Sequence, residues 1–114
     1  MSATLGEYKG YNGSVVYSSE DKVLHGKLIG IRDAVTYEGT DIKSLEKNFK
    51  AAIDEYLSFC KKERKKPDTP FKGSFNVRLG PDLHKRAALY AEEKDQKLNS
   101  VVQEAVEKYL AQAV

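Results

Sequence analysis

A charged stretch that contains two prolines divides this chain of 114 residues and limits what each part can fold into. Residues 61–70 read Lys-Lys-Glu-Arg-Lys-Lys-Pro-Asp-Thr-Pro, and a regular helix or strand cannot continue through two prolines in four residues. The sequence therefore predicts an N-terminal domain at residues 1–66, a linker at 67–71 and a short C-terminal domain at 72–114.

Positive charge gathers at this divide. Residues 61–80 hold 7 Lys or Arg against 2 Asp or Glu, whereas residues 1–60 hold 7 against 9 and residues 81–114 hold 5 against 6. A polyanion would be expected to bind at this basic stretch. The alternative is a solvated linker whose cations complement the C-terminal end of the preceding helix dipole.

The N-terminal part has the pattern of an antiparallel sheet followed by a helix. Alternating residues predict strands at 11–17, 23–29 and 34–37, and a helix is expected from about Asp41 with Thr40 as its N-cap. Apolar residues then recur at steps of three and four, which predicts a face packed on the sheet. These residues are Ile42, Leu45, Phe49, Ile53, Tyr56, Leu57 and Cys60. The expected class is α+β, with the single cysteine as a buried apolar residue.

The C-terminal part begins with a strand of strict period two. Its apolar face would carry Phe75, Val77 and Leu79, and its polar face Ser74, Asn76 and Arg78. Gly80-Pro81 ends this strand, and two amphipathic helices are expected, one to about Lys94 and one from about Leu98 to Ala113.

One strand and two helices in about 43 residues bury too little surface to be stable alone. Pairing two copies would form an antiparallel ribbon lying on four helices, and its outward polar rows would fit the major groove of DNA. We therefore expect a homodimer, with higher oligomers left open. The predicted dimer core comprises Phe75, Val77, Leu79, Leu83, Val102 and Val106.

This pattern, with the run Phe75-Asn76-Val77-Arg78, then Pro81 and then Leu98-Asn99-Ser100, resembles the ribbon-helix-helix fold of the Arc and MetJ repressors. The resemblance implies that Ser74, Asn76 and Arg78 reach base edges and that the amides of Asn99 and Ser100 meet a phosphate. Arginine can pair with guanine and asparagine with adenine, each worth about 1 to 3 kcal/mol of discrimination.

The turn between the two helices, Lys94-Asp95-Gln96-Lys97, departs from the family pattern of a glycine followed by a Ser or Thr cap. Asp95 can adopt a left-handed conformation at modest cost, but Lys97 has no side-chain oxygen for capping. We expect Lys97 and Lys72 to contact phosphates directly.

The whole chain, from about Tyr11 to Leu110, resembles the HicB antitoxin family. The matching pieces are Tyr11-x-Gly13, Tyr17-Ser18-x-Glu20-Asp21, His25-Gly26-x-x-x-Gly30-Ile31-x-Asp33, Tyr37-Glu38-Gly39, Asp54-Glu55-Tyr56-Leu57 and the ribbon-helix-helix module. The resemblance implies a partial ribonuclease H-like N-terminal domain that blocks HicA, a small toxin that cuts messenger RNA. It also implies repression of the antitoxin's own operon. For toxin binding, the acidic candidates are Glu20, Asp21, Asp33 and Glu38.

An enzyme is a competing class, because a ribonuclease H-like domain could retain nuclease activity. That chemistry needs several carboxylates around magnesium, normally with one in the first strand, and the strand expected at 11–17 has no acid. His25 and His84 have no metal partner at a recognisable spacing. We therefore expect no catalysis and no cofactor.

A third class is a stand-alone ribbon-helix-helix regulator without a toxin partner, which a neighbouring toxin-like reading frame would argue against. The chain has neither a long apolar run nor the pattern of a signal peptide. These features favour a protein of the bacterial cytoplasm with no membrane association.

Overall fold

The computed structural model describes residues 3–113 and divides into two compact units, Met1–Ser74 and Phe75–Val114. We call them the N-terminal unit and the C-terminal unit and describe each by itself. The linker at residues 67–71 stays a prediction, and the division between the units falls just after it.

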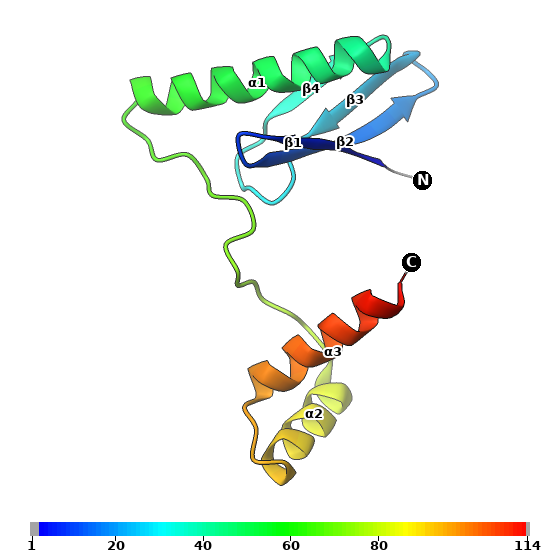
Figure 1. The fold of residues 1–114 in the computed structure, drawn as a ribbon, viewed down its shortest axis with the longest axis vertical. Helices are drawn as coiled ribbons and strands as arrows, with labels where there is room; N and C mark the ends of the chain where they lie inside the picture. The colour runs from blue at the N-terminus through cyan, green and yellow to red at the C-terminus, as the bar shows by residue number, and fades with distance from the viewer. Residues whose placement is uncertain (1–2, 114) are drawn as a thin grey trace. The chain divides into compact units, whose positions relative to one another are not determined.

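The N-terminal unit contains a four-stranded antiparallel sheet in the order β1-β2-β3-β4 (Figure 1). Its strands are β1 (Ala3–Tyr8), β2 (Tyr11–Ser18), β3 (Val23–Lys27) and β4 (Thr36–Gly39). Each strand pairs with the next along the chain, so every connection joins neighbouring antiparallel strands. Three or more strands with a covered apolar face can be stable where one hairpin is marginal.

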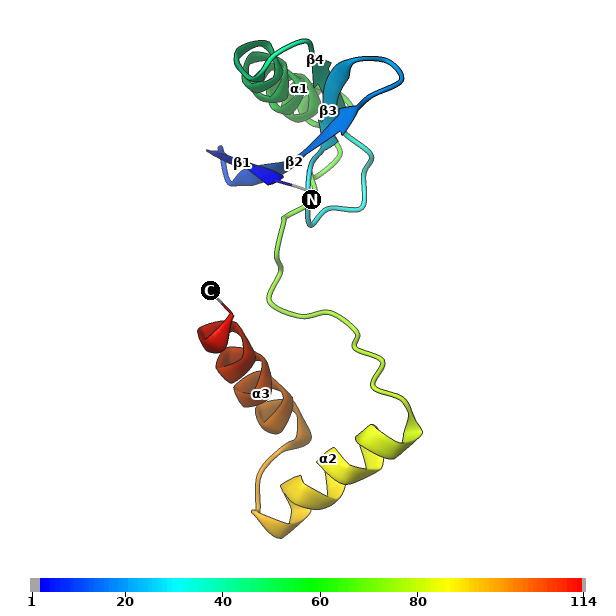
Figure 2. The same cartoon turned by 90° about the vertical axis from the view of Figure 1, so that its right-hand side faces the viewer.

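Helix α1 (Ile42–Lys62) covers one face of this sheet (Figures 1 and 2). Its apolar stripe packs on side chains from all four strands or their ends, which encloses a core in this unit. The buried residues are Leu5, Tyr11, Leu28, Tyr37, Leu45, Phe49, Ile53, Tyr56 and Cys60. The prediction that Cys60 is a buried apolar residue is confirmed.

Three details of the predicted N-terminal domain were wrong. The sheet has four strands instead of three, because β1 also pairs with β2. The sequence of β1 shows little alternation of apolar and polar residues, and its register with β2 is irregular. The N-cap of α1 is Asp41 and not Thr40, since the Asp41 carboxylate accepts the Ser44 amide at 2.7 Å. Ile42 is exposed instead of packed on the sheet.

The C-terminal unit consists of α2 (Pro81–Glu93) and α3 (Leu98–Gln112), which form a V joined by a short turn (Figure 2). Both helices match the predicted bounds to within one residue. The strand expected at residues 72–79 is not formed in the single chain. A strand needs a partner for its hydrogen-bond ladder, and no segment within residues 3–113 pairs with this one.

Candidate nucleic-acid interface

The segment proposed to read DNA is open to solvent on both of its faces. Phe75 is 85% exposed and Val77 is 51% exposed, although both belong to the apolar row. The polar row of Ser74, Asn76 and Arg78 is exposed as well. The single chain therefore presents a hydrogen-bonding row and an uncovered apolar row on the same short segment.

The helices behind this segment also leave their apolar faces open. Ala91, at 4% exposure, is the buried hydrophobic residue of α2 and α3 within the part of the chain described. Tyr109 is 74% exposed, while Leu83 and Val106 are each about half exposed. The C-terminal unit thus has the apolar surface for a core but does not enclose one by itself.

The first turn of α3 has the geometry of an anion site in part. Its N-cap, Lys97, has an extended backbone and no side-chain cap. The Ser100 amide donates to the Lys97 carbonyl at 3.0 Å, and the Asn99 amide has no backbone acceptor among the described residues. The positive end of the helix dipole and an open amide favour an anion at Asn99.

The turn before α3 has a conformation that the sequence allows. Asp95 adopts a left-handed backbone with φ of 55°. The Gln96 amide then donates to the Ala91 carbonyl at 2.8 Å, and the Asp95 amide donates to the Glu92 carbonyl at 3.2 Å. This pair of bonds is a Schellman motif, which closes α2 without glycine.

The predicted DNA-contacting residues are divided between the two units. Lys72 and Ser74 belong to the N-terminal unit. The C-terminal unit contains Asn76 and Arg78 before α2, and Lys97, Asn99 and Ser100 at the start of α3. All seven side chains lie on exposed residues.

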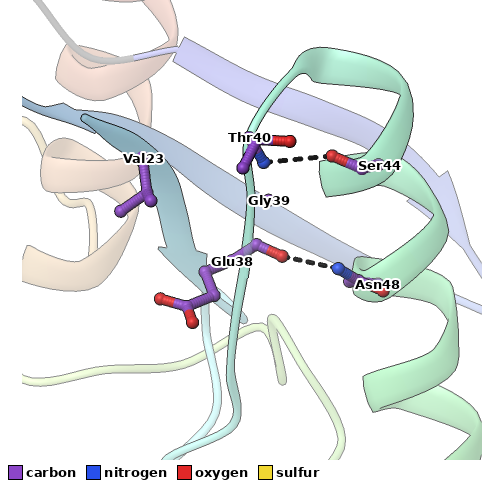
Figure 3. A pocket seen from close by; sticks show the side chains of 6 residues that line it. All are labelled: Val23, Glu38, Gly39, Thr40, Ser44 and Asn48. Atoms are coloured by element: carbon purple, nitrogen blue, oxygen red, sulfur yellow. Dashed lines mark hydrogen bonds between the residues drawn. The ribbon is translucent and has the colours of Figure 1, made fainter. Parts of the chain in front are cut away.

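Three of the four acidic candidates for toxin binding are exposed in the N-terminal unit. Glu20 and Asp21 lie in the turn between β2 and β3, and Glu38 lies on β4. Glu38 borders a shallow hollow of about 260 Å³ between β4 and α1, where Asn48 Nδ2 donates to the Glu38 carbonyl at 2.7 Å (Figure 3). The bond joins the edge strand to the helix and leaves the Glu38 carboxylate pointing away from Asn48 (Figure 3).

The fourth candidate, Asp33, is held by two neighbours. Its carboxylate accepts the Tyr56 hydroxyl at 2.8 Å and pairs with Lys65 Nζ at 2.7 Å. The hydrogen bond from Lys65, followed by that from Tyr56, holds the pKa of Asp33 below its usual value. Asp33 is therefore less available to a cationic partner than the other three acids.

A residue that the sequence did not single out, Asp68, fixes the start of the interdomain segment. Its carboxylate accepts the amides of Arg32 and Asp33 at 2.9 and 3.0 Å. Its own amide donates to the Tyr56 hydroxyl at 2.9 Å, and its carbonyl accepts the Tyr11 hydroxyl at 3.0 Å. Asp68 thereby anchors the chain beyond α1 to the loop before β4.

No helix among residues 3–113 is both long enough and apolar enough to span a bilayer.

Neither the curated proteins nor the solved structures include a match to this chain, so the partial ribonuclease H-like fold stays a prediction. The HicB family model matches residues 56–106, which run from within α1 to within α3. This match covers less than half of the chain and does not reach the four strands. Over these residues the chain is similar to the HicB family, and the similarity supports membership of that family.

Proposed function

We propose that this chain is an antitoxin that acts as a homodimer, represses its own operon by binding operator DNA and neutralises a HicA-type toxin that cuts messenger RNA. The observation that carries the DNA-binding part is the exposed apolar row of Phe75 and Val77 beside the polar row of Asn76 and Arg78. A toxin–antitoxin role is suggested by the similarity to the HicB family. The proposed location is the bacterial cytoplasm.

A second copy of the chain is the partner that best covers the apolar row. Two copies of residues 74–79 can pair as antiparallel strands, which satisfies their backbone groups and turns both apolar rows toward the helices. The half-exposed Leu83 and Val106 would then gain neighbours from the second copy. The paired ribbon would carry two sets of polar side chains on its outer face.

That outer face has the chemistry to read base edges. Arg78 offers a planar fork for the O6 and N7 atoms of guanine, and Asn76 can donate to and accept from adenine. Lys72 and Lys97 supply cations, and the open Asn99 amide supplies a donor, for contacts with phosphate. The DNA site is incomplete without the second copy, since one segment alone forms no ribbon.

Toxin neutralisation is proposed to occur by occlusion, with Glu20, Asp21 and Glu38 facing a cationic RNA-binding surface of the toxin. Reversing these three charges should weaken the toxin complex and make its affinity less dependent on salt, as measured by calorimetry at several ionic strengths. Unchanged affinity would remove the electrostatic part of the proposal.

A stand-alone transcription regulator is the second candidate function. The family match favours it in one respect, because the match covers residues 72–106 of the proposed DNA-binding module and omits the sheet. A short reading frame beside the gene that encodes a basic protein able to bind this chain would support the antitoxin. Its absence would support the regulator.

The test of DNA reading is a competition assay on the DNA upstream of the chain's own gene, with random duplex as competitor. Arg78→Ala should cost about 1 to 3 kcal/mol on the specific site and leave binding to random DNA nearly unchanged. Arg86→Ala is the matched control, because it removes an exposed arginine from α2 outside the proposed ribbon. Equal losses on both DNAs for Arg78→Ala would show that Arg78 does not read bases.

A further inference from the structure

The end of α1 carries a group of exposed cations that the proposed ribbon does not use. We define the α1 basic cluster as Lys61, Lys62, Arg64 and Lys66. We propose that this cluster is a second DNA contact, which binds backbone phosphates flanking the site read by residues 74–79. The inference rests on the proposed function and adds to it a sequence-independent grip from the N-terminal unit.

The cluster carries a net positive charge that its neighbours do not neutralise. Lys65, in the middle of the run, is paired with Asp33 at 2.7 Å, and Glu63 is the one acid within residues 61–66. The other four cations are exposed. Cations that are solvated and close in sequence are suited to replace the counterions of a polyanion.

The backbone of the cluster is fixed on both sides. The Lys65 amide donates to the Cys60 carbonyl at 2.8 Å and the Arg64 amide donates to the Lys61 carbonyl at 3.3 Å, which together form a Schellman motif at the end of α1. Two residues beyond the cluster, the four hydrogen bonds of Asp68 hold the chain to the body of the N-terminal unit. The cations therefore lie on a structured turn instead of a loose linker.

Arg64 has a backbone conformation that allows its side chain to be removed without loss of stability, as Lys22 also has. Arg64 is the residue after the helix cap and has φ of 55°, a left-handed conformation in which glycine is the least strained residue. An arginine is strained there, and its side chain is exposed and forms no ion pair among the described residues. Helix-dipole stabilisation does not require it, since Lys61 and Lys62 already occupy the last turn.

DNA is the polyanion that the cluster's place in the chain favours. From the anchored Asp68 to Ser74 the chain can extend at most about 20 Å, so a duplex bound by the ribbon lies within covalent reach of the cluster. Duplex DNA carries a negative charge about every 1.7 Å along its axis, so phosphates flank any site that the ribbon occupies.

The first experiment compares Arg64→Gly with Lys22→Gly in the full chain. Lys22 is a matched control, because it also has φ of 55° and also loses one positive charge, but it lies in the turn between β2 and β3. Both variants should raise Tm by about 2 to 5 °C through relief of the left-handed strain. The probe is a random-sequence duplex, and its affinity is measured by fluorescence anisotropy at several salt concentrations.

We expect Arg64→Gly to weaken binding to this duplex at about 0.1 M salt by about 5- to 10-fold for each chain of the proposed dimer, and to reduce the salt dependence by about one phosphate contact per chain. Lys22→Gly should bind as the wild type does. If Arg64→Gly is more stable than the wild type and binds DNA more weakly, a purely structural role for Arg64 is excluded. Wild-type affinity and salt dependence for Arg64→Gly would overturn the proposal.

The second experiment changes the four cluster residues together to glutamine. Its matched control changes four other exposed lysines of the N-terminal unit, Lys22, Lys27, Lys43 and Lys47, to glutamine. The cluster variant should reduce the salt dependence of binding by about three to four phosphate contacts per chain, and the control by less than one per chain. Equal effects of the two variants would show general electrostatic attraction and overturn the cluster as a site. Unchanged DNA affinity in both would overturn it too, in favour of an acidic protein partner.

These outcomes are separate from a failure of the proposed function. If wild type shows no preference for its own upstream DNA, sequence reading fails, while the random duplex still reports on the cluster. If Arg78→Ala loses specificity and the cluster variant retains wild-type affinity and salt dependence, the reader stands and the second contact is disproved.

Discussion

Gly26 on β3 has no room for a side chain in the core of the N-terminal unit. A Cβ atom at this position would overlap the backbone carbonyl of Ser14 and lie 2.7 Å from the Tyr37 hydroxyl. The same hydroxyl donates to the Ser14 carbonyl at 2.8 Å, so neither neighbour can move without breaking this bond. The close approach of β2 and Tyr37 to β3 thus requires a residue without a side chain at position 26.

Gly26→Ala is therefore expected to destabilise the N-terminal unit by about 3 kcal/mol through overpacking. Gly6→Ala on β1 is the matched control, because no atom lies within 4 Å of a Cβ placed there. Urea unfolding followed by circular dichroism would measure both free energies of unfolding. Similar stability of the two variants would contradict the packing described for β2, β3 and Tyr37.

The ion pair of Asp33 with Lys65 makes stability depend on pH in a defined direction. The pKa of Asp33 is lowered in the folded chain, first by the hydrogen bond from Lys65 and then by that from Tyr56. A carboxyl group whose pKa is lower in the folded than in the unfolded chain stabilises the fold at pH values above its ordinary pKa, which is 3.8 for Asp33. That contribution is lost as the pH falls through the lowered pKa.

We expect Asp33→Asn to have a lower Tm than the wild type near neutral pH, and the difference in Tm should shrink as the pH falls below 3.8. Glu20→Gln, which removes an exposed carboxylate from the turn between β2 and β3, serves as the control. Thermal melts from pH 7 to pH 2 measure the effect. A difference that stays constant across this range would contradict the assigned role of the ion pair.

At the scale of elements, the beginning of α1 depends on a reciprocal cap. The Asp41 carboxylate accepts the Ser44 amide, and the Ser44 hydroxyl accepts the Asp41 amide at 3.2 Å. Asp41→Ala should lower Tm by about 3 to 8 °C, since two helix-end amides lose their acceptors or their fixed geometry. Glu46→Ala, on the exposed face of the same helix, should change Tm far less. Equal changes would show that the cap does not stabilise α1.

The helices could be predicted from the sequence because their signals are local. The apolar stripe of α1, the proline at the start of α2 and the polar turn after Glu93 set bounds close to those of the structure. The hairpin of β2 and β3 was also predictable from alternation. Strand β1 was not, because Gly6 interrupts its pattern and its register with β2 is irregular.

The candidate site was predictable to different degrees in its two parts. The left-handed conformation of Asp95 followed from the local need for a tight turn without glycine. The anchoring of Asp68 joins residues far apart in the sequence, such as Tyr11 and Arg32, so no local pattern indicated it. The bonds that occupy Asp33 were missed for the same reason.

At the scale of the molecule, the two units differ in how complete they are. The N-terminal unit encloses nine buried apolar or aromatic side chains between sheet and helix. The C-terminal unit exposes Phe75, Val77 and Tyr109, whose burial would supply much of the stability of a small helical domain. We therefore propose that a second copy completes the C-terminal unit.

The most direct test of that claim is the mass of the full chain in solution by sedimentation equilibrium. We expect twice the chain mass of 12.8 kDa for the wild type and for Tyr17→Asp, which changes an exposed aromatic residue of the N-terminal unit. Phe75→Asp should shift the mass to that of a single chain, because a buried charge would disrupt the paired ribbon. A wild-type mass of 12.8 kDa at concentrations well above those of DNA binding would contradict the proposed homodimer.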